Sequence, residues 1–449
     1  MRAYRQADGP SLPAFASSQS FPKSCDVAIV GGGIVGVSAA WALASRGISV
    51  ALFEKGRIAG EQSSRNWGWV RQTGRDLREL PLMQLANRLW DRFSEELADD
   101  TGLRRTGILY TARSEEVMER HARWAAHAKD VGIDSRIIDG AAVERLVPGV
   151  TRKVPGAIYT PADGRAEPQR ASHAIAAAAV AKGAVIVEGC AVRAIETQGG
   201  RTSEVVTERG LVHSSSVIVA GGAWSQLMLR GLGVRLPQLK VLSSVLATAP
   251  VEAGPRASVS FSDLAVGRRL DGSYLAATSS ASNSYVTPDS FRYFCDFLPV
   301  LRRQLTSVRL RFGRAFLAEA LDWKPGQADR PSIYEAVRIL SPAPDAATLE
   351  TVRRRLAETL PAFRDVAVAR SWSGMIDTLP DVIPVISQIA SVPGCFVATG
   401  FSGHGFGIGP GAGQVVAELA TGERPSVDLA AFNLERFGQG SKLEVQSWL

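Results

Sequence analysis

One stretch of the chain, residues 25–54, constrains its fold more than any other and reads CDVAIVGGGIVGVSAAWALASRGISVALFE. An apolar strand runs into a glycine turn, a helix of small residues follows, and a second apolar strand ends on an acidic residue. Gly31 permits the tight turn, Gly33 lets the backbone approach a pyrophosphate, and Gly36 lets the helix pack closely on the sheet. The helix N-terminus also offers free N–H groups and a positive dipole end to phosphates. This stretch predicts a βαβ unit that binds a dinucleotide.

The acid that ends the second strand, Glu54, narrows the choice of dinucleotide. A carboxylate at this place accepts hydrogen bonds from both hydroxyls of an adenosine ribose, and it repels a 2′-phosphate. The ligand is therefore expected to be FAD or NAD rather than NADP, and this stretch by itself leaves those two open. An ordinary glycine-rich loop is the alternative, but the strands, the helix and the acid all stand in the required order.

Composition sets the wider limits. The chain has 449 residues, 45% hydrophobic and 21% charged, which is globular and long enough to predict two domains. Its net charge is +7, but the arginines are scattered and no basic tract is interleaved with aromatic residues, which argues against nucleic-acid binding. A site that binds acidic small molecules explains this positive charge better.

The four cysteines (Cys25, Cys190, Cys295 and Cys395) are far apart and predict reduced structural thiols in a cytoplasmic protein. No spacing of His, Cys and carboxylate residues indicates a metal site. No apolar run approaches the ~18 residues that a membrane span needs. The first 20 residues are polar and lack the apolar core of an export signal, so we expect a mobile or loosely docked extension.

Two later strands also end in glycine turns. Residues 216–220 lead into Gly221-Gly222-Ala223-Trp224, and residues 395–399 lead into GFSGHGFGIGPGAG (residues 400–413), with a helix expected from Gln414 to Thr421. A glycine turn that opens a helix places backbone N–H groups beside a bound ring, where they stabilise negative charge on the N1/O2 edge of a reduced flavin. A flexible surface loop is the alternative for residues 400–413. These two turns favour FAD over NAD.

The region of about residues 237–365 has a different pattern. Alternating strands at 239–247 and 269–277, separated by turn residues, precede a helical block and predict an antiparallel sheet with helices. Elsewhere apolar residues at three- and four-residue spacing predict a helix at residues 77–97. A polar helix is expected at 115–131 and another helix at 171–182.

Four motifs in order carry a resemblance to a known family: the stretch ending in Glu54, VIVAGGAW (217–224), SGMIDTLPDVIPVI (373–386) and ATGFSGHGFGIGPGAG (398–413). Together they resemble the FAD-dependent D-amino-acid oxidase superfamily, in particular its glycine oxidase, sarcosine oxidase and γ-glutamylputrescine oxidase branch. The resemblance covers nearly everything from Cys25 to about Thr421.

The resemblance implies an α/β fold, with a Rossmann-like FAD-binding domain and an inserted antiparallel-sheet substrate domain of the α+β type. The expected boundaries are an N-terminal extension at 1–22, an FAD-binding domain at 23–100, 155–236 and 366–449, and a substrate domain at 101–154 and 237–365.

The resemblance also implies how FAD lies: its adenosine on Glu54, its pyrophosphate on Gly31–Gly36, and its ring under the loop of residues 63–71, facing residues 400–407. The expected cofactor-binding residues come from all of these segments and are Gly31, Gly33, Ile34, Val35, Gly36, Glu54, Lys55, Ser63, Ser64, Arg65, Asn66, Val192, Ala220, Gly221, Trp224, Gly374, Gly400, Gly403, His404, Gly405 and Gly407. Sarcosine oxidases bind flavin through a cysteine shortly before the segment that matches SGMIDTLPD, and residues 370–375 of this chain contain none. FAD is therefore expected to bind noncovalently.

The implied reaction is the oxidation of a C–N bond. A hydride passes from the carbon beside an amine to flavin N5, and water hydrolyses the resulting imine. The flavin supplies the chemistry in such enzymes, and the protein positions and desolvates a substrate amine or amino acid. Oxygen or another carrier reoxidises the flavin, and the sequence does not distinguish them or define the oligomeric state.

Four residues are candidates for contact with the substrate. Arg71 and Arg269 can each bind a carboxylate as a bidentate fork, although exposed arginines are common. Trp67 and Trp69 alternate across the two faces of an extended segment, so one ring is expected to line the active site, and we choose Trp67 for this role. Core packing is the alternative for each ring. His404 lies in the glycine turn and can hydrogen-bond the cofactor or tune substrate protonation, or simply satisfy local backbone.

Other functions stay open on the sequence. A 2-hydroxy-acid FAD dehydrogenase has the same fold but needs a base for the hydroxyl proton. An FAD-carrying subunit of a larger oxidase complex is a third possibility. Arg65 either neutralises a phosphate or forms a salt bridge. A monooxygenase or NAD(P)H-dependent reductase is disfavoured, because Gly221-Gly222-Ala223 is too short for a second dinucleotide fingerprint.

Overall fold

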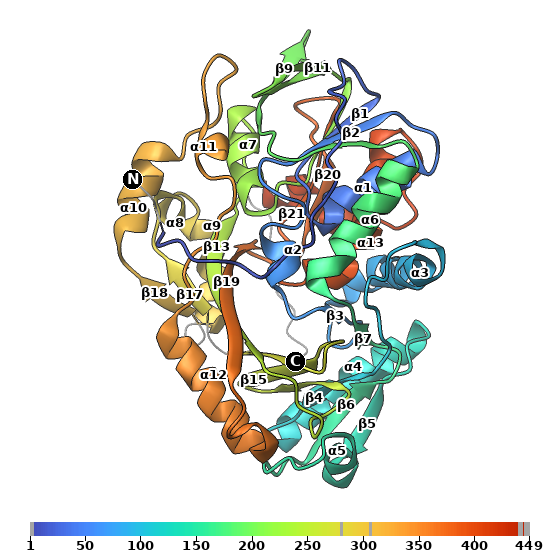
Figure 1. Cartoon of the computed structure of the whole chain (residues 1–449), viewed down its shortest axis with the longest axis vertical. Coiled ribbons are helices and arrows are strands. Elements are labelled where there is room, and N and C mark those ends of the chain that lie inside the picture. Colours follow the sequence, from blue (N-terminus) through green and yellow to red (C-terminus); the bar gives the residue numbers. More distant parts are fainter. Residues whose placement is uncertain (1–3, 279–281, 305–307, 439–442, 444–449) are drawn as a thin grey trace.

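The computed structural model describes residues 4–278, 282–304, 308–438 and 443. Two main sheets dominate the molecule, with a smaller one in the upper half of Figure 1 and a larger one that extends from its middle to its lower end. The predicted mixed α/β class is confirmed.

The smaller sheet has six strands among the residues that the structure describes, and its strand pairing explains why the glycine turns meet. Its order is β20 (Val385–Gln388), β21 (Cys395–Thr399), β12 (Ser216–Val219), β1 (Val27–Val30), β2 (Val50–Phe53) and β8 (Val185–Val187). Strands β21, β12, β1, β2 and β8 run parallel, while β20 is antiparallel. The carboxyl ends of β1, β12 and β21, each followed by a glycine turn, therefore lie at one edge of the sheet.

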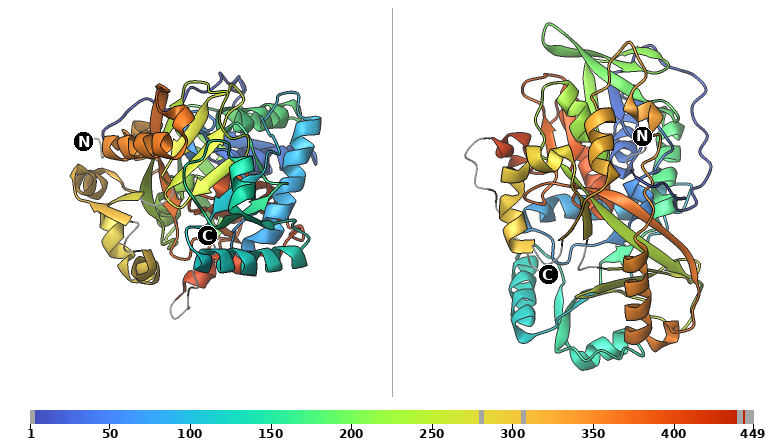
Figure 2. Two further views of the ribbon diagram at one scale, coloured as in Figure 1. Left: turned by 90° about the horizontal axis from the view of Figure 1, so that it is seen from below. Right: turned by 90° about the vertical axis from the view of Figure 1, so that its left-hand side faces the viewer.

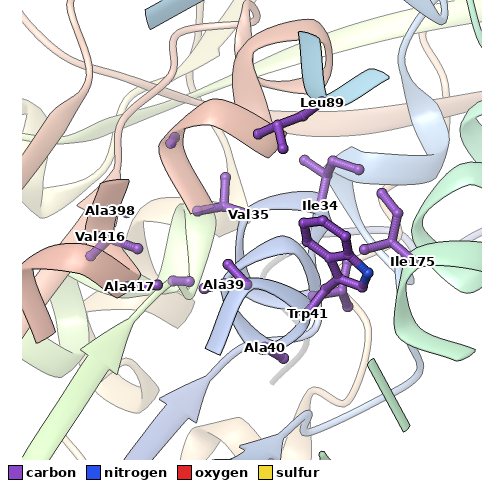
Figure 3. Close-up of a cluster of buried hydrophobic side chains, with 14 of the residues drawn as sticks. Ile34, Val35, Ala39, Ala40, Trp41, Leu89, Ile175, Ala398, Val416 and Ala417 are labelled. Atoms are coloured by element: carbon purple, nitrogen blue, oxygen red, sulfur yellow. The ribbon is translucent and has the colours of Figure 1, made fainter. Parts of the chain in front are cut away.

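Helix α1 (Ile34–Ala44) is buried along its whole length. Figure 3 shows its side chains between those of the helices beside it, which are α3 (Leu80–Glu96), α6 (Pro168–Ala181) and α13 (Gly405–Ala420). A helix surrounded in this way must be apolar or small on every side, which is what IVGVSAAWALA provides.

Helix α13 begins at Gly405, nine residues before the predicted start at Gln414. The prediction was wrong because it took the whole glycine-rich run of residues 400–413 as a turn, and glycine has a low helix propensity. In the structure these glycines allow close packing: a Cβ on Gly409 would lie 2.7 Å from Ile34 Cγ2, and one on Gly413 would lie 2.6 Å from Ser38 Cβ. Tertiary packing therefore overrides the local preference.

Within the described part of the chain, the larger sheet has ten strands. Along it run β18 (Val308–Arg311), β17 (Ser282–Tyr285), β13 (Leu239–Thr248), β16 (Tyr274–Ala277), β15 (Leu264–Arg268), β14 (Ser258–Phe261), β4 (Ile108–Thr111), β6 (Gly156–Thr160) and β5 (Arg136–Asp139), while β19 (Val368–Thr378) pairs with β13. The sheet is mixed rather than antiparallel throughout, because β14–β4 and β17–β18 are parallel pairs. Residues 269–277 were predicted to form one strand, but the strand begins only at Tyr274. Before it the chain forms a turn, in which Arg269 N–H donates a hydrogen bond to the Ser273 carbonyl (2.7 Å).

Two of these strands cross the expected domain division. Strands β6 and β19 belong to the larger sheet, although residues 155–236 and 366–449 were expected to form part of the FAD-binding domain. These two strands therefore belong with the larger sheet, contrary to the expected division, and the other domain boundaries stay predictions. Residues 1–3 of the expected extension, and 439–442 and 444–449 of the last segment, lie outside the described residues.

The remaining elements are short or lie on the surface. A third sheet contains β9 (Val192–Gln198), β10 (Arg201–Thr207) and β11 (Gly210–His213), and a two-stranded sheet pairs β3 (Trp69–Val70) with β7 (Gly164–Arg165). The other α-helices are α2 (Gln62–Arg65), α4 (Glu115–Asp130), α5 (Gly140–Leu146), α7 (Ser225–Gly231), α8 (Pro288–Arg292), α9 (Phe294–Gln304), α10 (Arg314–Asp322), α11 (Ile333–Ala336) and α12 (Ala346–Thr359). Short 3₁₀ helices occupy Leu77–Glu79, Gly222–Trp224, Pro361–Phe363, Ala430–Phe432 and Leu434–Phe437. Among the described residues, every helix is too short or too polar to cross a bilayer.

The N-terminal segment lies on the surface and docks through a few specific contacts, rather than being mobile. Tyr4 is 5% exposed, and its hydroxyl donates a hydrogen bond to Glu319 Oε1 (2.5 Å). Farther along, Ala7 N–H donates to the Ser341 carbonyl (2.9 Å), and Ser18 N–H donates to that of Ile186 on β8 (2.8 Å). Figure 2 shows this segment, in dark blue, along the outside of the molecule. It therefore joins the edge of the smaller sheet to the helices beside the larger one.

The close packing of α13 leads to a stability prediction. We expect Gly413→Val to lower the free energy of unfolding by about 1–3 kcal/mol, because the added atoms overpack the contact with α1. Gly313→Val is the matched control, since a Cβ there would meet nothing within 4 Å. Urea-induced unfolding of both variants measures the difference. Equal unfolding free energies for the two variants would contradict a packing role for Gly413.

Candidate cofactor and substrate site

A cavity of about 400 Å³ lies where the two main sheets meet. Segments distant in sequence form its wall: the turns after β1, β12 and β21, the loop around α2, and parts of β13 and β19. Most of the residues proposed from the sequence line it, namely Gly31, Gly33, Ile34, Val35, Glu54, Lys55, Ser63, Arg65, Asn66, Trp67, Arg71, Val192, Ala220, Gly221, Trp224, Gly374, Gly403, His404, Gly405 and Gly407.

Four proposed residues do not line the cavity: Gly36, Ser64, Gly400 and Arg269. Gly36 packs on the turn before it, where a Cβ would lie 2.0 Å from the Gly31 carbonyl oxygen. Ser64 is fully buried, and its hydroxyl donates to the Glu61 carbonyl. Gly400 supports the wall from behind, with a φ of 76°.

Arg269 is a correction to the substrate-binding prediction. Its guanidinium donates to Glu167 Oε2 (3.1 Å) and Gln169 Oε1 (3.2 Å), so its hydrogen-bonding fork is already occupied outside the cavity. A lone arginine in a sequence does not reveal such partners. Arg269 holds the turn before β16 rather than a substrate.

The start of α1 forms one end of the cavity and is shaped for phosphate. Gly31 has a φ of 109°, and a Cβ there would lie 2.5 Å from the Ala220 carbonyl oxygen. Only glycine allows the ends of β1 and β12 to approach so closely. Ile34 N–H donates to Ser63 Oγ (2.9 Å), which fixes the loop around α2 beside the helix N-terminus. The positive end of the α1 dipole thus faces the cavity.

Glu54 is held by backbone groups at the same end. Its Oε2 accepts a hydrogen bond from Gly32 N–H (2.7 Å), and its Oε1 accepts one from Gly56 N–H (2.7 Å). Burial raises the pKa of Glu54, while Lys55 and these two hydrogen bonds oppose the rise. Because each oxygen has a second lone pair, the carboxylate can still accept the hydroxyls of a ribose.

Lys55 and Trp224 are fixed by one acid that was not predicted from the sequence. Glu61 Oε1 accepts hydrogen bonds from Lys55 Nζ (2.7 Å) and Trp224 Nε1 (3.0 Å). Lys55 Nζ also lies 4.3 Å from the centre of the Trp224 ring, a cation–π distance. This group forms a polar and aromatic wall beside Glu54.

Within the described residues Arg65 is held by neutral oxygen atoms rather than by a salt bridge, and its contact with a phosphate stays a prediction. Its guanidinium donates to the carbonyls of Gly60 (3.0 Å) and Ser373 (2.7 Å) and to Ser341 Oγ (3.0 Å). Burial lowers the pKa of Arg65, although nearby Glu61 opposes this. Arg65 therefore ties the α2 loop to β19 and to the loop at Ser341.

The other end of the cavity is aromatic and cationic. The Trp67 and Trp69 rings meet edge to face, with centroids 5.2 Å apart, and Tyr110 packs edge to face on Trp69 (5.9 Å). The Arg71 guanidinium carbon lies 5.6 Å from the centre of the Tyr110 ring. All of these line the cavity, so both tryptophans contribute where one was expected. Tyr110 was missed because it lies on β4, far away in sequence.

His404 stands over a buried ion pair. Arg75 and Glu79 are both 1% exposed, with Nη1 and Oε1 3.5 Å apart, and Arg75 Nη2 donates to the His404 carbonyl (3.0 Å). Burial lowers the pKa of Arg75 to about 10, and it raises the pKa of Glu79. Burial, helped by Arg71 and Arg75, holds the pKa of His404 well below its usual value, so this imidazole is neutral. The pair was not predicted, although Arg75 lies close to Arg71 in the sequence.

Together, the turn after β1, the α1 N-terminus and Glu54 define a Rossmann-type dinucleotide-binding protein. Over residues 26–419 the sequence matches the family described as FAD dependent oxidoreductase. The chain belongs to this family, and its cofactor is FAD.

The similar proteins agree with this assignment. L-amino acid deaminase from Proteus vulgaris superposes with a TM-score of 0.90 and 30% identity, over 95% of this chain and 100% of that one. The enzyme of the same name from Proteus myxofaciens, in complex with anthranilate, gives 0.93 and 29%, over 97% and 98%. Sarcosine oxidase subunit beta from an Arthrobacter species is 25% identical over 97% of this chain and 96% of its own length. Mitochondrial sarcosine dehydrogenase from Mus musculus is 24% identical, but the match spans only 43% of its length.

The residues present fit FAD at both ends. The glycine cradle and Glu54 suit its adenosine diphosphate portion, and the cavity continues without a break to the turn at Gly403–Gly407. There the N-terminus of α13 faces the cavity, as α1 does at the opposite end.

Glu54 leads to a test of cofactor binding. We expect Glu54→Ala to weaken FAD binding by about 10–100-fold, because hydrogen bonds to a charged group contribute about 1.5–3 kcal/mol. Glu144→Ala is the control, since Glu144 is about half exposed and pairs with Lys153 at the surface. Titration of FAD into the apoproteins, followed by tryptophan fluorescence, measures both dissociation constants. Unchanged binding by the Glu54 variant would place the adenosine elsewhere.

Proposed function

We propose that the protein oxidises the C–N bond of an amino acid or another carboxylate-bearing amine. When bound, FAD would accept a hydride from the substrate carbon next to nitrogen. Water would then hydrolyse the imine product. The observation that carries this proposal is the position of Arg71, a cationic fork on the cavity wall beside three aromatic rings. The names of similar proteins support it, because L-amino acid deaminase, sarcosine oxidase and glycine oxidase are each named for an amino acid.

The residues at the aromatic and cationic end of the cavity have separate tasks. Arg71 binds the carboxylate through two N–H groups, and its Nη1 contact with the Thr73 carbonyl (2.5 Å) fixes its direction. The edge-to-face rings of Trp67, Trp69 and Tyr110 exclude water and hold the apolar part of the substrate. Neutral His404 can exchange a hydrogen bond with the substrate amine without adding positive charge.

Arg71 gives the kinetic test of this proposal. We expect Arg71→Ala to raise KM for a carboxylate-bearing substrate by about 10–100-fold with a smaller change in kcat, because a charge-assisted contact is lost from the ground state as well as the transition state. Arg269→Ala is the matched control, since its fork binds Glu167 and Gln169 outside the cavity.

Anaerobic bleaching of the flavin by amino acids, N-alkyl amino acids and the corresponding decarboxylated amines identifies the substrate class. The proposal fails if the decarboxylated amines bleach the wild-type flavin as well as the amino acids do. Readmitting oxygen and measuring peroxide then separates an oxidase from a dehydrogenase that uses another acceptor.

We also propose that FAD binds noncovalently and that the protein is cytoplasmic. All four cysteines are free, and none lines the cavity. Burial raises the pKa of Cys25 to about 11 and that of Cys395 to about 12, so these thiols stay protonated and unreactive. Acid precipitation is expected to release all of the flavin into the supernatant, and flavin that remains with the washed pellet would contradict this.

A 2-hydroxy-acid dehydrogenase is the second candidate. His404 favours it, because the imidazole is neutral and lines the cavity, as a base for a hydroxyl proton requires. Bleaching by 2-hydroxy acids but not by amino acids would establish it. The similarity to a sarcosine oxidase subunit also supports a role as the FAD-carrying part of a complex, which size-exclusion chromatography with activity measurements tests.

A further inference from the structure

Asp377 is a buried carboxylate in the cavity wall that takes no part in the proposed reaction. It lies near the end of β19, is 2% exposed and lines the cavity. Its Oδ2 accepts hydrogen bonds from Gly400 N–H (2.8 Å), Thr399 Oγ1 (3.2 Å) and Gln238 Nε2 (3.2 Å). All three donors are neutral, so hydrogen bonds rather than an opposite charge hold this acid.

The same residue holds the turn before α13 through its backbone. The Asp377 carbonyl accepts a hydrogen bond from Ser402 N–H (2.9 Å), and Leu379 N–H donates to Ser402 Oγ (3.2 Å). Ser402 has a φ of 52°, a left-handed conformation that a residue with a side chain rarely adopts. Gly400 and Gly403 flank it with φ values of 76° and 87°. Such a turn persists only where its surroundings fix it.

We propose that Asp377 is a positioning residue that fixes the turn of residues 400–403, so that the N-terminus of α13 faces the cofactor, and that its charge tunes the cofactor. The turn leads directly into α13 at Gly405, and Phe401, Ser402 and Gly403 themselves line the cavity. A helix N-terminus stabilises a negative charge that lies next to it. A carboxylate beside that position opposes the same negative charge when it is ionised.

The surrounding charged groups leave Asp377 unpaired. Lys240 stands opposite it on β13, but Lys240 Nζ binds Glu319 Oε2 (2.9 Å). On the α2 side Glu61 binds Lys55, and at the start of α13 His404 faces Glu79 at 4.0 Å. Within the described residues, no cationic group forms an ion pair with Asp377.

Burial accordingly raises the pKa of Asp377 to about 6, although the hydrogen bonds from Gly400 and Thr399 oppose the rise. The acid therefore changes charge near neutral pH, next to the cofactor cavity. Because the pKa of Asp377 is higher in the folded than in the unfolded protein, protonated Asp377 contributes to the free energy of unfolding at low pH, and this contribution is fully present below about pH 4. It is lost as the pH rises from about 4 to about 6.

The experiment uses the holoenzyme with Asp377→Asn and Asp377→Ala. The flavin absorption spectrum and reduction potential of the wild type, recorded from pH 5 to pH 8, are expected to show a transition near pH 6. Asp377→Asn keeps a hydrogen-bonding side chain but cannot ionise, so we expect the transition to vanish and FAD binding to change little. Asp377→Ala is expected to lose the transition and also to weaken FAD binding by about tenfold, because the turn loses its anchor.

Asp381→Asn is the matched control. Asp381 is equally buried and lies four residues farther on, but its carboxylate pairs with Arg436 (2.8 Å) and does not line the cavity. We expect this variant to lose stability and keep the flavin transition. A transition that persists in Asp377→Asn would overturn the tuning role, and unchanged FAD binding in Asp377→Ala would overturn the positioning role. These measurements require bound FAD but no substrate, so either failure leaves the proposed amine oxidation standing.

Discussion

The close approach of two helices is the constraint on which the site depends. Helices α1 and α13 follow two strands of one sheet, and each must direct its N-terminus into the same cavity. Glycine at 409 and 413 leaves room for Ile34 and Ser38, while Gly36 lets α1 lie against the turn before it. Any larger side chain would separate the helices, and two positive dipole ends would no longer face one bound molecule.

The two ends of the cavity are built by different means. At the α1 end, backbone N–H groups and one carboxylate do most of the binding, and Glu54 is held by Gly32 and Gly56. Such contacts recognise features common to every FAD molecule. At the other end, side chains from several elements meet, including Arg71, Tyr110 and His404. The proposed function places substrate choice at this end, because side chains can change without disturbing the backbone of the glycine turns.

Cross-links between distant segments keep these ends aligned. Arg65 joins the α2 loop to β19, and Asp377 joins β19 to the turn before α13. The N-terminal segment adds an outer tie through Tyr4 and Ser18. Each tie satisfies buried polar groups, which would otherwise be costly to remove from water.

The dinucleotide unit can be predicted from the sequence alone, because its glycines, helix and terminal acid interact within about 30 residues and leave a local pattern. The resemblance to a known family also located most of the cavity wall, and the structure brings these segments together where strand ends meet at one sheet edge. The tertiary structure was needed to find the early start of α13, where packing on α1 outweighs the low helix propensity of glycine. It likewise excluded Arg269, whose partners lie about 100 residues away, and brought in Tyr110, Arg75 and Glu79. Side-chain partners depend on which strands pair and which helices pack, and no local spacing records that choice.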